Sequence, residues 1–293
     1  MAKFVLSAFA DEAGNSAEEQ INALVENEIS YIEPRNIDGK GILSLTDDEL
    51  RIFKSKLDEN GIKVNSLGSP IGKYPIDKPL EDHLIDLKKA FNACKLLNTD
   101  KIRMFSFFVE QNALKENRDE VVRRLRIMAD MADSEGILLC HENESRIFGQ
   151  NPSEVKDILT AVPSLGAIFD AANYRMNDCD VIDGINATFI NLAYLHIKDA
   201  IFSEQAIVPA GEGEGQLEKI LDTVDKHTDE VVYLTLEPHL MLFEAYKSID
   251  EHALKGHHVF NNNREAFDFA ANSLKGLLTK LGFRKDENNQ WIR

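Results

Sequence analysis

Four acidic or imidazole side chains stand at the ends of consecutive predicted strands in the second half of the chain. They are Glu142, Asp170, His196 and Glu237. Three carboxylates brought together would repel one another and raise one another's pKa, and a divalent cation would remove that conflict. Three carboxylate oxygens and one imidazole suit Mn²⁺, Mg²⁺ or Co²⁺, with Zn²⁺ as a further candidate. One such residue alone is more often a salt-bridged strand end, but all four on adjacent strands predict a site for one divalent metal ion.

The elements that must position these residues alternate regularly along the chain. Short apolar runs, which are typical of buried strands, recur between segments with helical periodicity. The predicted strands are residues 4–9, 29–34, 62–67, 102–108, 137–141, 167–169, 192–197 and 231–236. Three of the predicted helices begin after Ser16, Thr46 and Asn151. The other predicted helices cover residues 80–97, 120–132, about 181–189, 217–224 and 264–281.

Local signals place several helix ends. Ser16 with Glu19, and Thr46 with Glu49, have the spacing of a capping box, in which each side chain satisfies a backbone amide of the other residue. Gly61 is expected to end the second helix, because glycine tolerates left-handed backbone angles. The helices are therefore supported by their caps as well as by their apolar faces.

Eight strands that are apolar on both faces and separated by helices imply a parallel sheet covered by helices. Within 293 residues this pattern suits an α/β fold, the closed (β/α)₈ TIM barrel, whose active sites lie at the C-terminal ends of the strands. A doubly wound open sheet is the alternative, but no G-x-G-x-x-G motif follows the first strand.

The organisation of the chain favours one domain. No Pro/Ser/Gly-rich linker divides it, so we expect a single barrel over residues 1–293 with a closing helix at about 264–281. A long loop is expected at about 238–262, and it could be a lid or a subunit contact. Assembly into a homo-oligomer therefore stays open.

Composition limits the classes of partner. The net charge of −17 repels polyanions, so we expect no nucleic-acid partner. No apolar run approaches the roughly 20 residues that span a bilayer, and Asp11 and Glu12 come too early for a signal peptide, so we expect no membrane association. The three cysteines lack a C-x-x-C spacing, which favours reduced thiols and a cytoplasmic protein. Cys140 could be a nucleophile, but its apolar flanks favour a buried strand thiol.

Motifs at these strand ends resemble the sugar phosphate isomerase/epimerase group of the xylose isomerase-like barrels, from the first strand to about Phe243. The motifs are His141-Glu142-Asn143-Glu144, Phe169-Asp170-Ala171-Ala172-Asn173, His196-Ile197-Lys198-Asp199, Gly211-Glu212-Gly213-Glu214-Gly215 and Leu236-Glu237-Pro238-His239. The resemblance implies a TIM barrel in which Glu142, Asp170, His196 and Glu237 hold one divalent metal ion. It also implies that Glu142 and Glu237 act as acid and base on either face of a bound sugar.

One position departs from the pattern of this group. Many relatives have a histidine three residues after the aspartate, where it contacts substrate or supports a further metal ion, but this chain has Asn173. An amide can hydrogen-bond a hydroxyl, yet it is a poorer metal ligand than imidazole and cannot shuttle protons. A two-metal hydride shift of the xylose isomerase type is therefore disfavoured.

The function that these residues and the resemblance imply is a divalent-metal-dependent isomerase or epimerase of a small sugar or sugar phosphate. The metal ion would bind a substrate carbonyl and its neighbouring hydroxyl and so acidify the shared α-carbon proton. One glutamate would remove that proton to give a metal-stabilised enediolate, and the other would return a proton.

Three other functions use the same architecture. A polyol or inosose-type dehydratase would eliminate water with the same metal site. An abasic-site endonuclease generally uses three zinc ions and additional histidines, which the first four strand ends lack here, and the acidic net charge disfavours DNA. A non-catalytic sugar-binding barrel would have no need of an intact ligand set.

Further polar residues near the strand ends are candidates for substrate binding. They are Glu33, Arg35, Lys73, Arg103, Asn173, Lys198, Asp199 and His239. Arg35, Lys73 and Arg103 could recognise a phosphate or carboxylate on the substrate, or could pair with local carboxylates. For Lys198 and Asp199, support of the neighbouring ligand is favoured over direct catalysis. His239 could equally be a packed loop residue.

Two other motifs look like sites and are interpreted as loops. Residues 211–215 alternate glycine with glutamate, so the acids would repel a phosphate, and the segment is expected to be a flexible turn. The pair His257-His258 falls in the long loop and is more often incidental than a metal site.

Overall fold

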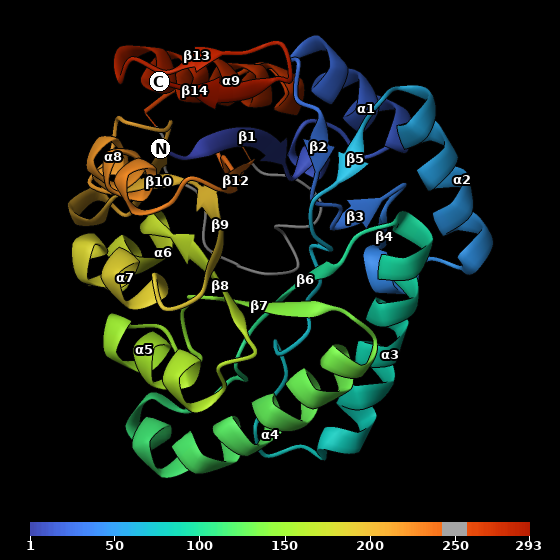
Figure 1. Ribbon diagram of the computed structural model, residues 1–293, viewed down its shortest axis with the longest axis vertical. Helices are drawn as coiled ribbons and strands as arrows, with labels where there is room; N and C mark the ends of the chain where they lie inside the picture. Colours follow the sequence, from blue (N-terminus) through green and yellow to red (C-terminus); the bar gives the residue numbers. More distant parts are fainter. Residues whose placement is uncertain (242–256) are drawn as a thin grey trace.

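The computed structural model is a barrel of parallel strands surrounded by helices (Figure 1). It describes residues 1–241 and 257–293. The barrel strands are β1 (Lys3–Ala8), β2 (Tyr31–Ile32), β5 (Lys63–Val64), β6 (Lys101–Met104), β7 (Leu138–Glu142), β8 (Gly166–Asp170), β9 (Leu192–Ile197) and β12 (Val231–Leu236). The predicted (β/α)₈ architecture is confirmed, and the open-sheet alternative is wrong.

Backbone hydrogen bonds close the strands into a ring. β1 pairs in parallel with β12, and β9, β8, β7 and β6 follow as parallel neighbours. On the other side, the Glu33 amide donates to the Ala8 carbonyl at 3.0 Å, which joins the end of β1 to the end of β2, and β2 pairs with β5. Leu67, just past β5, bridges to Ile102 of β6 and completes the circle.

Helices connect the strands and cover the outside of the barrel (Figure 1). They are α1 (Ala17–Glu26), α2 (Asp47–Glu59), α3 (Leu80–Leu97), α4 (Leu114–Ser134), α5 (Pro152–Ala161), α6 (Ala171–Met176), α7 (Val181–Thr188), α8 (Leu217–His227) and α9 (Asn263–Lys280). Both predicted capping boxes are present, Ser16 with Glu19 and Thr46 with Glu49. The predicted ranges 80–97, 192–197 and 231–236 coincide with α3, β9 and β12.

Some boundaries differ from the sequence predictions. α4 begins at Leu114 rather than at residue 120, because its first turns are polar and the apolar periodicity starts later. The strand predicted over 102–108 ends at Met104, and Phe107 beyond it has a φ of +71°, which a strand cannot accommodate. α6 was not predicted, since it has only six residues and begins where the side chain of Asp170 accepts from the Asn173 amide.

Three antiparallel hairpins also escaped the sequence predictions. They are β3 (Asn36–Ile37) with β4 (Lys40–Gly41), β10 (Asp199–Ile201) with β11 (Ala206–Val208), and β13 (Arg284–Lys285) with β14 (Gln290–Ile292). Strands of two or three residues carry too little periodicity to be recognised. β14 pairs antiparallel with β1, so the two ends of the chain lie close together (Figure 1).

The last helix of the chain lies close to the predicted range, ahead of the unpredicted hairpin of β13 and β14. The predicted closing helix is α9, at Asn263–Lys280. Of the predicted long loop at 238–262, residues 242–256 lie outside the described part of the chain. Among the helices that the structure describes, none combines the length and apolar character needed to cross a membrane.

Cys140 is completely buried inside the barrel. It packs with Ile168 and Tyr194, and it has no exposed surface. Burial raises the pKa of the Cys140 thiol, which opposes formation of a nucleophilic thiolate. The interpretation as a buried strand thiol therefore holds.

Gly72 lies in a turn where two main-chain segments touch. Its φ is +87°, and an added Cβ would lie 1.9 Å from the carbonyl oxygen of Phe105. The Gly72 amide also donates to Nε2 of His83 at 2.8 Å, so the turn is held in place. We expect Gly72→Ala to lower the free energy of unfolding by about 3 kcal/mol, because overpacking adds to left-handed backbone strain.

Gly61→Ala is the matched control for this prediction. Gly61 also has a positive φ, +68°, but nothing lies within 4 Å of an added Cβ. Its replacement should therefore cost only about 1 kcal/mol, the backbone contribution. Urea denaturation of both variants separates the two contributions, and equal losses of stability would contradict the steric explanation.

Candidate metal centre

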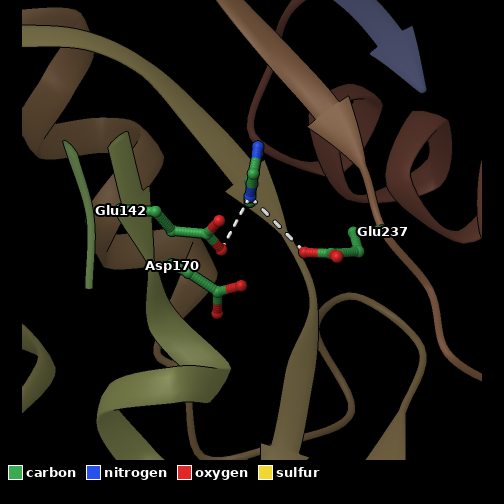
Figure 2. A group of neighbouring side chains, drawn as sticks. Glu142, Asp170 and Glu237 are labelled. Atoms are coloured by element: carbon green, nitrogen blue, oxygen red, sulfur yellow. Dashed lines mark hydrogen bonds and ion pairs between the residues drawn. The ribbon is translucent and has the colours of Figure 1, made fainter. Parts of the chain in front are cut away.

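The four predicted ligands meet at the C-terminal mouth of the barrel. Glu142 ends β7, Asp170 ends β8, His196 lies in β9 and Glu237 directly follows β12. Figure 2 shows the carboxylates of Glu142, Asp170 and Glu237 pointing toward a common centre from separate elements. One potential ligand atom from each of the four residues lies within 4.8 Å of all the others. The structure therefore brings the whole predicted set together.

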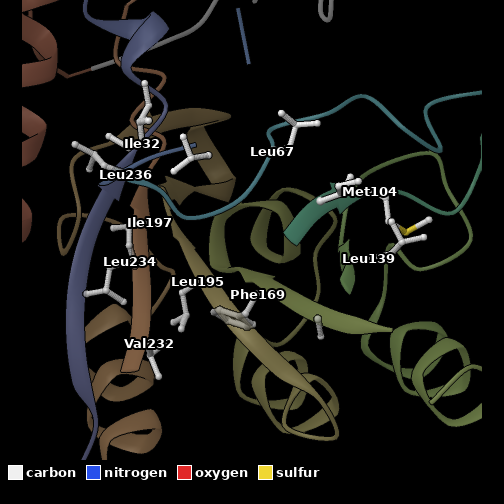
Figure 3. Close-up of a cluster of buried hydrophobic side chains, with 14 of the residues drawn as sticks. Ile32, Leu67, Met104, Leu139, Phe169, Leu195, Ile197, Val232, Leu234 and Leu236 are labelled. Carbon is white, nitrogen blue, oxygen red and sulfur yellow. The ribbon is translucent and has the colours of Figure 1, made fainter. Parts of the chain in front are cut away.

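Strand alternation explains why these side chains point into the barrel. In β9, Leu195 and Ile197 belong to the main apolar core between strands and helices, and the intervening His196 faces the interior. Leu236 at the end of β12 belongs to the same core, which Figure 3 shows along the strands, so Glu237 is the next inward residue. The apolar residues that hold the helices against the barrel thereby also aim the ligands.

The facing atoms can be identified from the contacts. Nδ1 of His196 lies 3.0 Å from Oε1 of Glu142 and 3.4 Å from Oε2 of Glu237. Nζ of Lys198 lies 3.0 Å from Oδ2 of Asp170 and 3.3 Å from Oε2 of Glu237. These contacts assign one inward-facing atom to each of the four predicted ligands.

Asp170 provides the test of whether a cation fits here. Its Oδ2 is buried and accepts no hydrogen bond from the described residues, although the Lys198 ammonium lies close to it. Burial raises the pKa of Asp170 to about 7, against the opposing charge of Lys198, and the nearby carboxylates of Glu237 and Glu142 raise it further. A buried carboxylate in this state is the ligand that a divalent cation would satisfy, so the residues fit a metal ion.

The outer oxygens of the two glutamates are held by arginines. Oε2 of Glu142 lies 3.4 Å from Nη1 of Arg103, and Oε1 of Glu237 lies 3.0 Å from Nη1 of Arg35. Arg103 also approaches Oε1 of Glu237, at 3.9 Å. Arg35 and Arg103 therefore pair with the proposed ligands, as one of the two sequence interpretations expected.

The outer atoms of the other two ligands also have partners. Oδ1 of Asp170 accepts from the backbone amide of Asn173 at 2.9 Å, and Nε2 of His196 lies 3.3 Å from Oε2 of Glu33. The side-chain amide of Asn173 contacts Oε1 of Glu142 at 3.4 Å. Asn173 and Glu33 thus touch the ligand set directly.

The protonation states in this cluster follow from burial and charge. Burial opposes the imidazolium form of His196, but the carboxylates of Glu142 and Glu33 prevail and raise its pKa well above the usual value. Burial likewise opposes ionisation of Glu237, but the Lys198 ammonium holds the pKa of that carboxyl well below its usual range. The positive charges of Lys198 and of a protonated His196 therefore oppose the negative charge of the carboxylates.

Two candidate substrate-binding residues contact the proposed ligands, and a third pairs with a nearby acid. Lys198 sits against two of them, and it is only 7% exposed. Nε2 of His239 lies 3.5 Å from Oε1 of Glu237, and burial together with the charge of Lys198 lowers the pKa of His239 well below the usual value. Lys73 is paired with Glu144 at 3.1 Å.

Asp199 was expected to support the neighbouring ligand His196, but its carboxylate contacts a loop instead. The carboxylate accepts hydrogen bonds from backbone amides of this loop, at donor–acceptor distances of 2.8 to 3.1 Å. The donors are Ala200, Gly211, Gly213 and Gly215. An added Cβ at Gly213 would lie 2.2 Å from Oδ1 of Asp199, which explains why glycine occurs there. The predicted turn at 211–215 is present, and Asp199 holds its backbone amides, a contact that the sequence did not indicate.

Two functional neighbours were missed by the sequence analysis. Asp11 binds Arg35 in bidentate fashion, with both contacts at 3.0 Å, and Glu12 contacts the same guanidinium at 3.3 Å. Burial raises the pKa of Glu12 to about 8, although Arg35 opposes the shift. Both acids lie three and four residues beyond Ala8, the last residue of β1, so a search for acids slightly farther from the strand ends could have found them.

Comparisons with known proteins agree with this architecture. The family model described as the xylose isomerase-like TIM barrel matches residues 21–253. The search of curated proteins finds no match.

Solved structures show the same fold at low sequence identity. A structure of the IOLI protein with a bound zinc atom is 15% identical, with a TM-score of 0.73, over 95% of this chain and 99% of that one. D-allulose 3-epimerase from Methylomonas sp. is 16% identical, with a TM-score of 0.69, over 94% and 100%. The probable 3-DHS dehydratase AsbF from Bacillus anthracis is 14% identical, with a TM-score of 0.69, over 94% and 99%. At these identities the structures establish the fold, and the family model covers most of the sequence. The chain belongs to the xylose isomerase-like TIM barrel family.

Proposed function

We propose that this protein is a divalent-metal-dependent isomerase or epimerase of a small sugar or sugar phosphate. The observation that carries the proposal is the convergence of one ligand atom each from Glu142, Asp170, His196 and Glu237 within 4.8 Å. The buried Oδ2 of Asp170, which accepts no hydrogen bond from the described residues and lies beside the Lys198 ammonium, supports a cation at their centre. Mn²⁺, Mg²⁺ and Co²⁺ suit this mixture of three carboxylates and one imidazole, and Zn²⁺ is a further candidate.

The bound ion would supply Lewis-acid polarisation of a substrate carbonyl and its neighbouring hydroxyl, which makes the carbon-bound proton between them more acidic. The side chains of Glu142 and Glu237 then transfer that proton. Glu142 and Glu237 approach the same centre from β7 and from the end of β12, as Figure 2 shows. One carboxylate removes the proton and the other returns one, to the same carbon for epimerisation or to the neighbouring carbon for isomerisation.

The surrounding polar groups bind and orient the substrate in this proposal. Lys198 donates to a substrate oxygen beside the ligands, where its ammonium is already placed between Asp170 and Glu237. His239 and Lys73 offer further donors for hydroxyl or phosphate oxygens. The buried surroundings limit the access of water, which strengthens each of these polar contacts.

A lyase that removes water is the second candidate function. The observation that favours it is the Lys198 ammonium, which lies 3.0 Å from Oδ2 of Asp170 and can protonate a departing hydroxyl. Similarity in fold to a probable dehydratase is consistent with this reaction. The proton-abstraction step would be the same in both candidates, and only the fate of the neighbouring hydroxyl would differ.

Proton NMR of the metal-loaded protein with sugars and sugar phosphates in D₂O tests the proposal. Incorporation of solvent deuterium at one carbon, with the substrate mass otherwise unchanged, supports epimerisation or isomerisation. Loss of water supports the lyase. Absence of exchange and of turnover across the panel, in protein shown to contain the metal ion, would contradict both reactions.

A further inference from the structure

Glu33 lies behind His196, on the opposite side of the ring from the other proposed ligands. Its side chain has no exposed surface. Oε2 of Glu33 is 3.3 Å from Nε2 of His196, whereas Nδ1 of the same ring faces Glu142 and Glu237. A substrate at the cluster would therefore meet the imidazole before it could reach Glu33.

A chain of hydrogen bonds holds Glu33 in this position. The Tyr194 hydroxyl is 2.9 Å from Oε1 of Glu33 and 2.9 Å from Oγ of Ser66. Because the carboxylate can only accept, the Tyr194 proton goes to Glu33, and the Ser66 hydroxyl donates to the Tyr194 oxygen.

The direction of these bonds determines the tautomer of a neutral His196. Both oxygens of the Glu33 carboxylate are acceptors, one facing Tyr194 and one facing Nε2 of the ring, so Glu33 stabilises a proton on Nε2 when a cation rather than a proton occupies Nδ1. Nδ1 then presents its lone pair to the centre formed by the carboxylates. The opposite tautomer would place a proton on Nδ1, where the ion is expected. It would also leave the lone pair of Nε2 facing Oε2 of Glu33, so that two acceptors would meet without a proton between them.

We propose that Glu33 is a positioning residue for the metal centre, which fixes the ring orientation and the tautomer of His196 so that Nδ1 binds the ion. This inference rests on the proposed metal site and assigns Glu33 a place other than the substrate contact expected from the sequence. A carboxylate behind a ligating histidine also raises the basicity of the ligand, and loss of such a partner typically weakens metal binding by about 10- to 100-fold.

Calorimetric titration of the full-length, metal-free protein with Co²⁺ tests the proposal. Glu33→Gln keeps the size of the side chain and an acceptor for Nε2 but removes the charge, and we expect binding weakened by about 10- to 100-fold. Tyr194→Phe removes only the support of Glu33, so we expect a smaller loss. Asp225→Asn is the matched control, because Asp225 is a buried carboxylate that pairs with Arg293 near the start of β1. The affinity of this variant protein for Co²⁺ should stay within about twofold of wild type.

A spectroscopic readout separates positioning from general stability. In the Zn²⁺-loaded wild type, ¹⁵N NMR should show His196 protonated at Nε2 and not at Nδ1. If Glu33→Gln fails to fold, the Co²⁺ affinity of Tyr194→Phe tests the role instead, and an affinity equal to that of wild type would then overturn it. Protonation at Nδ1, or a folded Glu33→Gln that binds Co²⁺ as tightly as wild type, would overturn the role of Glu33. A wild-type protein that binds no divalent ion at all would instead remove the metal site itself.

Discussion

Glu142→Gln and Glu237→Gln should each lower kcat by a factor of at least about 10² to 10⁴ at saturating metal ion, because general acid–base transfer contributes rate enhancements of that size. The amide has nearly the same shape as the carboxylate but cannot accept the carbon-bound proton. Each carboxylate also faces the proposed metal site, as the contacts with Nδ1 of His196 show. The measurement is therefore steady-state turnover on the substrate that the D₂O screen identifies, with metal content determined for each variant.

Glu120→Gln is the control for these variants. Glu120 lies on the outer helix α4, where it pairs with Arg123 and Arg124, so its substitution makes the same chemical change away from the mouth. It should leave kcat unchanged within about twofold, because distant, independent sites act separately. Near-normal turnover in both Glu142→Gln and Glu237→Gln would show that neither carboxylate transfers the proton.

Removal of the metal ion should abolish turnover and lower the melting temperature. Burial raises the pKa of Asp170 to about 7 in the metal-free site, with neighbouring Glu237 and Glu142 adding to the shift, which reflects the cost of holding these carboxylates together. An ion that binds only the folded state stabilises it by about 2.7 kcal/mol when present at about 100 times its Kd. Turnover and the melting temperature should both return when Mn²⁺, Co²⁺ or Mg²⁺ is added back.

Scanning calorimetry before and after chelation, with elemental analysis of the same samples, measures this effect. Asp170→Asn is the comparison variant, because it removes the charge of the carboxylate whose Oδ2 faces the proposed ion, and it should lose most of the metal-dependent increase in melting temperature. A protein that is shown to be free of metal ions, yet retains wild-type turnover, would contradict the proposed chemistry.

The positions of the four proposed ligands were predictable because they depend on local patterns. A short run of apolar residues between helical segments predicts a strand, and the polar residue at its end faces the mouth once the strand is part of a barrel. This logic located Asp170 after 167–169 and Glu237 after 231–236, and both strands are found there. The capping boxes at Ser16 and Thr46 were equally accessible, since each involves residues only three positions apart.

The partners of those ligands were not predictable in the same way. Arg35 was interpreted both as a phosphate-binding cation and as a paired ion, and the structure places it against Asp11 and against Glu237. Arg35 and Glu237 are separated by most of the chain, so only closure of the barrel brings them together. The amino-acid types alone cannot distinguish an arginine that meets substrate from one that meets a carboxylate.

The sequence by itself determined the barrel, the order of its strands and helices, and the identity of Glu142, Asp170, His196 and Glu237 as a converging set. The physical reason is that strand periodicity, helix caps and strand-end polarity are interactions between near neighbours. Only the tertiary structure decided that Glu33 lies behind His196 and that Asp199 binds the glycine loop. Those contacts depend on which strands become neighbours across the ring and on where a loop folds back, and both are set by packing over the whole chain.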